Sequence, residues 1–210
     1  MVSIIISLEA LLLTVVLSID VFAVSFAYGS SKIKIPFKSM MVITVIGSII
    51  LGVSLYFGVL VQQFIPYQVA GILSFSILFL LGLFRIFDSA LKSFIRKHSN
   101  ASKKVEFSLF NFKFILNVYA DPEKADIDNS RTISPKEAVA VAVAVAIDAL
   151  VLGFGAGLVD VNHLQIIAFS LVLDVIAIVL GCYIGGKVAT KFAINLSWLG
   201  GLILIALAIL

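Results

Sequence analysis

The sequence contains little charge and almost no cysteine. Only 13% of its 210 residues are charged, whereas 61% are hydrophobic. A soluble globular domain carries about 25% charged residues, so a soluble domain is excluded. The single cysteine, Cys182, excludes an internal disulfide framework. The sequence also lacks a phosphate-binding glycine loop, a nucleophile triad and a redox motif, which argues against an ATP-driven pump and against an enzyme.

Long apolar runs fill the chain instead. A helix of about 20 apolar residues spans the hydrocarbon core of a bilayer, which is about 30 Å thick. Six stretches reach that length, and they predict an all-α polytopic membrane protein. The first has no Lys or Arg before it, so we expect it to be retained as a helix rather than cleaved as a signal peptide. The six predicted spans are residues 4–28, 39–61, 67–87, 137–158, 164–184 and 192–210.

Basic residues are missing from one side of the predicted membrane domain. With six spans, the connections after the first, third and fifth lie on the same side, and they contain 14 of the 15 Lys and Arg residues. The remaining one, Arg85, lies near that side within the third span. The positive-inside rule then puts this side in the cytosol and both termini outside. The net charge of +3 therefore reflects topology, and no nucleic-acid partner is expected.

The spans divide into two halves of three. The segments SIDVFAVSFAYG, from Ser18, and AIDALVLGFGAG, from Ala146, share Ile-Asp, Phe and Gly at a constant offset of 128 residues. If the two halves are repeats, their odd number of three spans means that they insert in opposite orientations. Transporters built from inverted repeats of this kind bind substrate at the midplane between the repeats. Alternating apolar residues between Phe110 and Val118 predict a strand or hairpin in the loop that joins the halves. The predicted units are 1–87 (first repeat), 88–136 (cytosolic loop) and 137–210 (second repeat).

Three acids, Asp20, Asp148 and Asp174, lie deep within predicted spans. A charge at the bilayer centre costs at least about 2.5–3.5 kcal/mol, and no Lys or Arg lies at the same depth to offset it. We therefore expect a metal cation, or protons, to neutralise these carboxylates. Oxygen ligands favour Mg, Ca or Mn, and neither His98 nor His163 lies in a span to favour zinc or copper. The alternative is a hydrogen bond between protonated acids.

The two Asp-bearing segments, SIDVFAVS and AIDALVLG, resemble the paired signature of the bacterial manganese efflux pump family. The run from Leu199 to Leu210 resembles the last helix of that family. This resemblance implies six helices in two inverted repeats, export of Mn(II), and Asp20 and Asp148 as ligands within the membrane. The longer loop is similar to that of a related group, the sporulation membrane proteins of the YtaF type in endospore formers.

A second set of oxygen ligands precedes the fourth span. With Asp126 as position 1 of a twelve-residue loop, these ligands have the spacing of an EF-hand, which takes Ca, Mg or Mn. Position 6, a glycine in EF-hands, is Arg131, for which a left-handed conformation costs about 1 kcal/mol. Pro122 and a short lead-in predict half of an EF-hand, without a full entering helix. The alternative is a solvated acidic linker. The candidate ligands are Asp126, Asp128, Ser130, Thr132, Ser134 and Glu137.

These features together predict a secondary transporter of a divalent cation, with Mn(II) and export favoured, in a bacterial cell membrane and serving sporulation. Exporting a divalent cation against an inside-negative potential costs about 4.6 kcal/mol per 100 mV, so coupling to a proton or another ion is expected. No tightly bound cofactor is expected. One alternative is a non-transporting sporulation membrane protein with an assembly or signalling role. Another is an exporter of small organic cations or amino acids.

Overall fold

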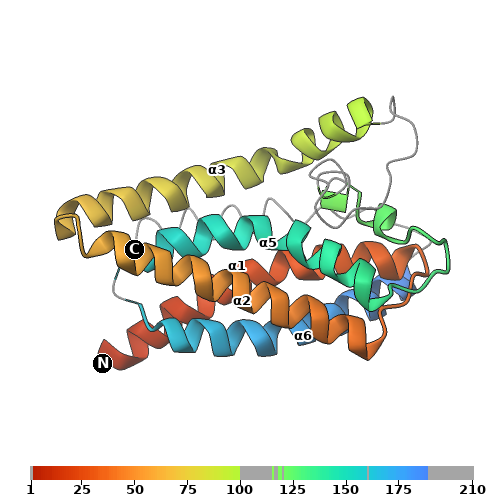
Figure 1. The fold of residues 1–210 in the computed structure, drawn as a ribbon, viewed down its shortest axis with the longest axis horizontal. Helices are drawn as coiled ribbons and strands as arrows, with labels where there is room; N and C mark the ends of the chain where they lie inside the picture. The colour runs from red at the N-terminus through yellow and green to blue at the C-terminus, as the bar shows by residue number, and fades with distance from the viewer. Residues whose placement is uncertain (1, 100–114, 116–117, 120, 160, 189–210) are drawn as a thin grey trace.

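The protein is a bundle of long helices that lie nearly side by side (Figure 1). The computed structural model describes residues 2–99, 115, 118–119, 121–159 and 161–188. Within that part of the chain all regular structure is helical, apart from one isolated bridge between Lys34 and Thr132. The helices are α1 (Val2–Ser30), α2 (Phe37–Gln62), α3 (Tyr67–Ser99), η1 (Pro122–Ala125), α5 (Pro135–Gly157) and α6 (His163–Val188).

Proline marks where helices begin and is absent from their interiors. Because proline lacks an N–H group, it is tolerated in the first turn of a helix but breaks a helix interior. Pro36 is the N-cap of α2, and Pro66 immediately precedes α3. Pro122 and Pro135 are the first residues of η1 and α5. These are all four prolines of the chain, so the long apolar runs between them continue without a kink residue.

Four of the described helices, α1, α2, α5 and α6, are long and apolar enough to cross a membrane. The expectation of an all-α membrane protein is therefore confirmed. Helix α3 has a shorter apolar part, Tyr67–Leu83, and continues as helix to Ser99, well past the predicted end of the third span. The sixth predicted span, 192–210, lies outside the described residues.

The prediction of a strand or hairpin between Phe110 and Val118 was wrong for the residues of this stretch that the structure describes. Ile115, Val118 and Tyr119 are the described residues of that stretch and its border, and all three are helical. Val118 is 2% exposed and belongs to the same apolar cluster as Val141 of α5. Burial against the bundle therefore decides the conformation here, since tertiary packing overrides a weak local alternation.

Helix pairs approach so closely that glycine is required. Helix α1 packs mainly on α6, and α2 packs mainly on α5. A Cβ atom at Gly29 in α1 would collide with the backbone carbonyl oxygen of Cys182 in α6. A Cβ atom at Gly157 in α5 would collide in the same way with the carbonyl oxygen of Leu55 in α2. Such small-residue contacts are the usual means by which membrane helices pack without a hydrophobic driving force.

The same arrangement recurs one turn away in each pair. A Cβ atom at Gly58 would lie 2.5 Å from the carbonyl oxygen of Phe154, and one at Gly185 would collide with that of Phe26. Each interface thus contains glycines from both helices, set against backbone carbonyls of the partner helix. The α1–α6 and α2–α5 interfaces are built alike.

We expect Gly157→Ala to destabilise the bundle by about 1–3 kcal/mol, because the added methyl group forces α2 and α5 apart. The measurement is thermal unfolding of the purified protein in detergent, with a lowered midpoint expected. Gly71→Ala in α3 is the matched control, because a Cβ atom there meets nothing within 4 Å. The control should leave the midpoint unchanged or raise it, since alanine favours helix over glycine. Equal midpoints for the two variants would contradict the close packing.

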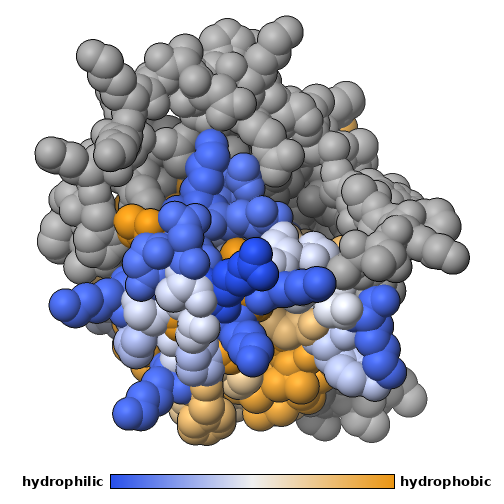
Figure 2. All heavy atoms as spheres, turned by 90° about the vertical axis from the view of Figure 1, so that its right-hand side faces the viewer, coloured by the Kyte–Doolittle hydropathy of each residue, from blue (hydrophilic) through white to orange (hydrophobic). Residues whose placement is uncertain are grey.

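One end of the bundle is hydrophilic. Helices α1 and α6 end there and α2 and α5 begin there (Figure 1). Figure 2 views this end directly and shows hydrophilic side chains gathered over it. Every described Lys and Arg side chain belongs to segments at this end, in agreement with the uneven charge distribution of the sequence. They are Lys32, Lys34, Lys38, Lys124, Arg131, Lys136 and Lys187.

Candidate functional site

A small, partly open cavity lies in the bundle where α1, α2, α5 and α6 meet. Its volume is about 30 Å³, enough for a single water molecule or a small ion. Asp174, near the middle of α6, is the acidic residue that lines it. Ser170 lines it one turn earlier on the same helix face. The remaining lining residues are apolar side chains and Gly47, so Asp174 faces a cavity with few competing polar groups.

The two polar residues that line this cavity, Asp174 and Ser170, each contact a buried serine of another helix. Asp174 is 7% exposed, and one of its carboxylate oxygens accepts a hydrogen bond of 2.8 Å from the Ser18 hydroxyl of α1. The hydroxyls of Ser48 in α2 and Ser170 in α6 lie 3.2 Å apart. Ser18, Ser48 and Ser170 are all buried. The arrangement offers one carboxylate and neutral hydroxyls, which is a ligand set suited to a hard cation.

Asp20 and Asp148 lie beside this cavity and not in its lining. Both are half-buried, and both interact with other groups of the protein. Asp20 directly precedes Val21, and Asp148 directly precedes Ala149, and these two neighbours do line the cavity. The two acids therefore occupy similar places relative to it, one on α1 and one on α5. Their role as metal ligands stays a prediction.

Sequence reasoning missed the serines. Ser170 lies four residues before Asp174, which puts both on one face of a helix, and this spacing is a signal that could have been used. Ser18 lies within the segment SIDVFAVS, beside Asp20. Ser48 carries no such signal, because it becomes relevant only through the packing of α2 on α6.

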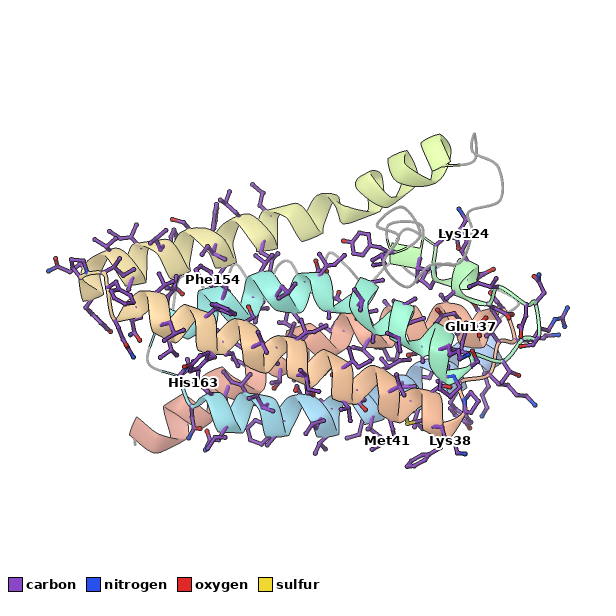
Figure 3. The ribbon with its side chains drawn as sticks, in the orientation of Figure 1. Lys38, Met41, Lys124, Glu137, Phe154 and His163 are labelled. Atoms are coloured by element: carbon purple, nitrogen blue, oxygen red, sulfur yellow. The ribbon has the colours of Figure 1, made fainter. Side chains whose placement is uncertain are left out.

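A second cluster lies at the hydrophilic end of the bundle. One carboxylate oxygen from each of Asp126, Asp128 and Glu137 lies within 4.8 Å of the others. Two oxygens on opposite sides of a calcium ion are about 4.6–5.2 Å apart, twice the usual Ca–O distance. The three acids of the predicted EF-hand loop are therefore brought together. Figure 3 shows Glu137 at the same end as Lys38 and Lys124, and Phe154 and His163 toward the other.

The loop backbone turns as an EF-hand loop would need to turn. Asn129 and Arg131, at positions 4 and 6, have φ values of 54° and 57°. Arg131 thus takes the left-handed conformation that glycine usually provides at this position. Its N–H donates to one oxygen of Asp126 at 3.0 Å, and the N–H of Ser130 donates to the other at 3.1 Å. The single 3₁₀ turn of η1 stands where an EF-hand would have its entering helix.

Glu137 is held at the start of α5 by a capping box. Ser134 is the N-cap, and its hydroxyl accepts the N–H of Glu137. The N–H of Ser134 in turn donates to Oε2 of Glu137 at 2.9 Å. Oε1 accepts the N–H of Ile127 at 2.9 Å, so Glu137 also ties the loop to the helix. This reciprocal pairing is why the sequence begins a helix at this position.

Local hydrogen bonding and burial set the acidity of the loop. Burial raises the pKa of Asp126 above its ordinary value, and the N–H of Arg131 partly offsets this. Hydrogen bonds from Ser130 lower the pKa of the exposed Asp128 carboxyl. The hydroxyl of Ser130 donates to the carbonyl of Thr132 at 3.0 Å. Ser130 therefore contacts Asp126 and Asp128 through its N–H, while its hydroxyl pairs with the backbone of Thr132.

The loop is attached to the connection between α1 and α2. The N–H of Lys34 donates to the carbonyl of Arg131, and the N–H of Ile133 donates to the carbonyl of Lys34, each at 2.9 Å. The Ser39 hydroxyl donates to the carbonyl of Ile133 at 2.6 Å. Ile133 itself is fully buried. These bonds make the loop a fixed part of the bundle end, which weakens the interpretation of a solvated linker.

Comparison with known proteins agrees with this membrane architecture. Residues 50–210 match the model of a family described as "Putative manganese efflux pump". The chain is also 28% identical over 203 residues to "Probable sporulation protein YtaF" of Bacillus subtilis (strain 168). The aligned region covers 95% of this chain and 96% of that protein. No solved structure matches. The resemblances found in the sequence are thereby confirmed.

Proposed function

The chain belongs to the manganese efflux pump family, and from this we propose that it is a secondary transporter that exports a divalent cation, Mn(II), from the cytosol. The observation that carries the proposal is the small cavity in the bundle that Asp174 lines, with Ser18 hydrogen-bonded to the Asp174 carboxylate. A carboxylate in the middle of an apolar helix is costly, and a transported cation is a reason to keep it. A proton that replaces the cation on the same carboxylate would supply the coupling.

We also propose that the two halves are inverted repeats. The packing supports this, because each main contact has a counterpart. Gly29 against Cys182 corresponds to Gly157 against Leu55, with offsets of about 128 residues on one helix and about 127 on the other. Each helix packs mainly on a helix of the other half, α1 on α6 and α2 on α5. A two-fold axis in the membrane plane that relates α1 to α5 and α2 to α6 would produce this pairing.

The cavity lining follows the same correspondence. Gly47 of α2 is the counterpart of Asp174 of α6, and both line the cavity. Ile43 is likewise the counterpart of Ser170, and both line it too. A cavity lined by corresponding residues of two repeats lies on the axis that relates them, where transporters of this design bind their substrates. The site differs between the halves, because only one half contributes the acid.

The test is metal uptake by liposomes that contain the purified protein. Mn(II) flux that exceeds the flux in protein-free liposomes, and that changes with an imposed pH gradient, is the expected result. Flux of small organic cations or amino acids without a metal dependence would favour the exporter alternative. If no solute is transported by protein that is folded and correctly inserted, the transport proposal fails.

The similarity to a sporulation protein favours a second candidate function. It covers nearly the whole chain, so the same fold could serve spore formation without transport, in assembly or signalling. The same liposome experiment separates the two candidates, since only a transporter gives metal-dependent flux. If both apply, manganese export would take place during sporulation.

The proposed orientation places the hydrophilic end in the cytosol and both chain termini outside. We expect a cysteine at Gln63 to react with an impermeant thiol reagent added to intact cells, and a cysteine at Lys34 to be protected. Both positions are exposed and lie in connections at opposite ends of the bundle. Cys182→Ser removes the native thiol, and permeabilised cells provide the control in which both positions react. The reverse labelling pattern would overturn the orientation.

A further inference from the structure

Tyr28, near the end of α1, carries a buried hydroxyl that lies among residues of η1, the loop and α5. Its side chain is fully buried near the end of α1. Its hydroxyl has no hydrogen-bond partner in the part of the chain that the structure describes. Buried polar groups are nearly always paired, and each exception needs an explanation. The explanation here has to come from the surroundings of this hydroxyl.

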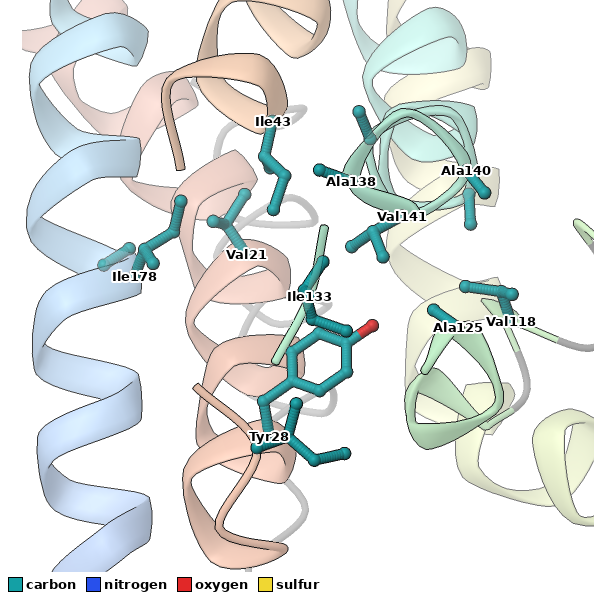
Figure 4. Close-up of a cluster of buried hydrophobic side chains, with 14 residues drawn as sticks. Val21, Tyr28, Ile43, Val118, Ala125, Ile133, Ala138, Ala140, Val141 and Ile178 are labelled. Carbon is teal, nitrogen blue, oxygen red and sulfur yellow. The ribbon is translucent and has the colours of Figure 1, made fainter. Parts of the chain in front are cut away.

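Those surroundings are acidic. Figure 4 shows the Tyr28 ring beside Ile133, with the hydroxyl directed from α1 toward the space between Val141 of α5 and Ala125 of η1. Glu137 lies in the first turn of α5 and Asp126 directly follows η1, so both carboxylates belong to the elements that border this hydroxyl. A neutral hydroxyl donor is therefore aimed at a region where carboxylates gather.

The three carboxylates of the cluster lie close together and accept hydrogen bonds from neutral groups of the loop. The hydrogen bonds that reach Asp126, Asp128 and Glu137 come from backbone N–H groups and from Ser134. Asp126 and Glu137 are 9% and 6% exposed, so solvent screens their repulsion poorly. Three acids at this spacing are stabilised most directly by a bound divalent cation.

We infer that Asp126, Asp128 and Glu137 bind a hard divalent cation of the calcium, manganese and magnesium class, and that the Tyr28 hydroxyl donates a hydrogen bond to a water molecule on that ion. The three carboxylates supply the charge, and water supplies the ligands that the loop does not. This site is separate from the membrane cavity, and its existence does not depend on transport.

The site would connect the two helices that carry the paired membrane acids. Glu137 lies in the first turn of α5, and Asp148 lies about 16.5 Å farther along that helix at 1.5 Å per residue. Tyr28 lies near the end of α1, about 12 Å from Asp20 by the same rise. An ion held between Glu137 and Tyr28 therefore fixes the cytosolic ends of α1 and α5 relative to each other.

The test is calorimetric titration of the full-length protein in detergent with calcium, manganese and magnesium chloride in turn. All variants carry Asp174→Asn, so that heat from the membrane cavity is removed. We expect saturable binding with a Kd of about 10⁻⁴–10⁻³ M, in the weak part of the EF-hand range because Arg131 opposes the cation. The order of affinities for the three salts identifies the ion that the site prefers.

Glu137→Gln should weaken binding by at least about tenfold, because it removes a charge and the bidentate carboxylate. Glutamine still forms the capping box, so the helix start is preserved. Glu123→Gln is the matched control, since Glu123 is an exposed acid of the adjacent turn that lies outside the cluster, and it should bind as the parent does. Tyr28→Phe should weaken binding by about three- to tenfold through loss of one hydrogen bond.

Equal affinity of the parent and the Glu137→Gln variant for all three ions would overturn the inference, as would the absence of saturable heat in the parent. Equal affinity of the parent and the Tyr28→Phe variant would overturn the role of the hydroxyl. Because the parent already carries Asp174→Asn, these results are independent of whether the wild-type protein transports Mn(II). A failure of the loop site is thus distinguishable from a failure of the transport proposal.

Discussion

Asp174→Asn is expected to reduce Mn(II) flux by about 100-fold or more while leaving the protein folded. The substitution keeps the size of the side chain and its ability to accept the Ser18 hydrogen bond, but removes the negative charge from the cavity. Removing one partner of a buried charge pair costs about 3–5 kcal/mol, which corresponds to a factor of at least 100 in affinity. The measurement is initial metal uptake by liposomes at fixed protein content, with the thermal unfolding midpoint as a check on folding.

The relation between the halves provides a rescue experiment. Gly47 is the proposed counterpart of Asp174 and lines the same cavity, and a Cβ atom built there meets nothing within 4 Å. Gly47→Asp combined with Asp174→Asn therefore returns a carboxylate to the cavity from the opposite side. We expect partial recovery of flux in the double variant. Wild-type flux in the Asp174→Asn variant would show that the cavity is not part of the transport path. If only the rescue fails, the proposed two-fold axis is contradicted.

Much of the helical architecture could be predicted from the sequence. The ends of the apolar runs coincide with α1, α2, α5 and α6 to within a few residues, because span length and proline placement are one-dimensional properties of the chain. The EF-hand-like loop was predictable for a related reason. Its ligands follow one another in sequence at fixed spacing, and the structure brings its three acids within 4.8 Å.

The composition of the cavity could not be predicted in this way. Helix α6 is almost uniformly apolar, so hydrophobic periodicity does not indicate which face turns inward, and only the spacing of Ser170 and Asp174 hints at it. The sequence motif drew attention to Asp20 and Asp148, whereas the residue that faces the cavity is Asp174, which has no acidic counterpart in the other half. Its partner Ser18 is far away in sequence and meets it only because α1 packs on α6.

The hydroxyl of Tyr28 was missed for the same reason. A tyrosine near the end of an apolar helix is ordinarily an interfacial residue whose polar group reaches water. Here the loop from η1 to α5 covers that helix end and buries the ring completely. The environment of Tyr28 is created by residues about a hundred positions later in the chain, and no local pattern contains that information.

Asp20→Asn and Asp148→Asn should each lower Mn(II) flux strongly, and the double variant should abolish it. Both acids are half-buried within spans, and each lies next to a residue that lines the cavity. Removing the charge saves the cost of holding a carboxylate in the membrane, about 2.5–3.5 kcal/mol on insertion scales, so insertion should not suffer. A loss of flux with intact insertion would therefore report on the cation and not on folding.

Because the two acids occupy corresponding places in the proposed repeats, we expect losses of similar size from the two single substitutions. Glu123→Gln, an exposed acid at the hydrophilic end, is the control for a general effect of lost negative charge and should transport normally. Near-normal flux in the double variant would show that Asp20 and Asp148 serve packing through hydrogen bonds, and would leave Asp174 to hold the cation alone. A loss of flux in only one of the two single variants would mean that the repeats share a fold but that only one of them supplies a ligand to the cation.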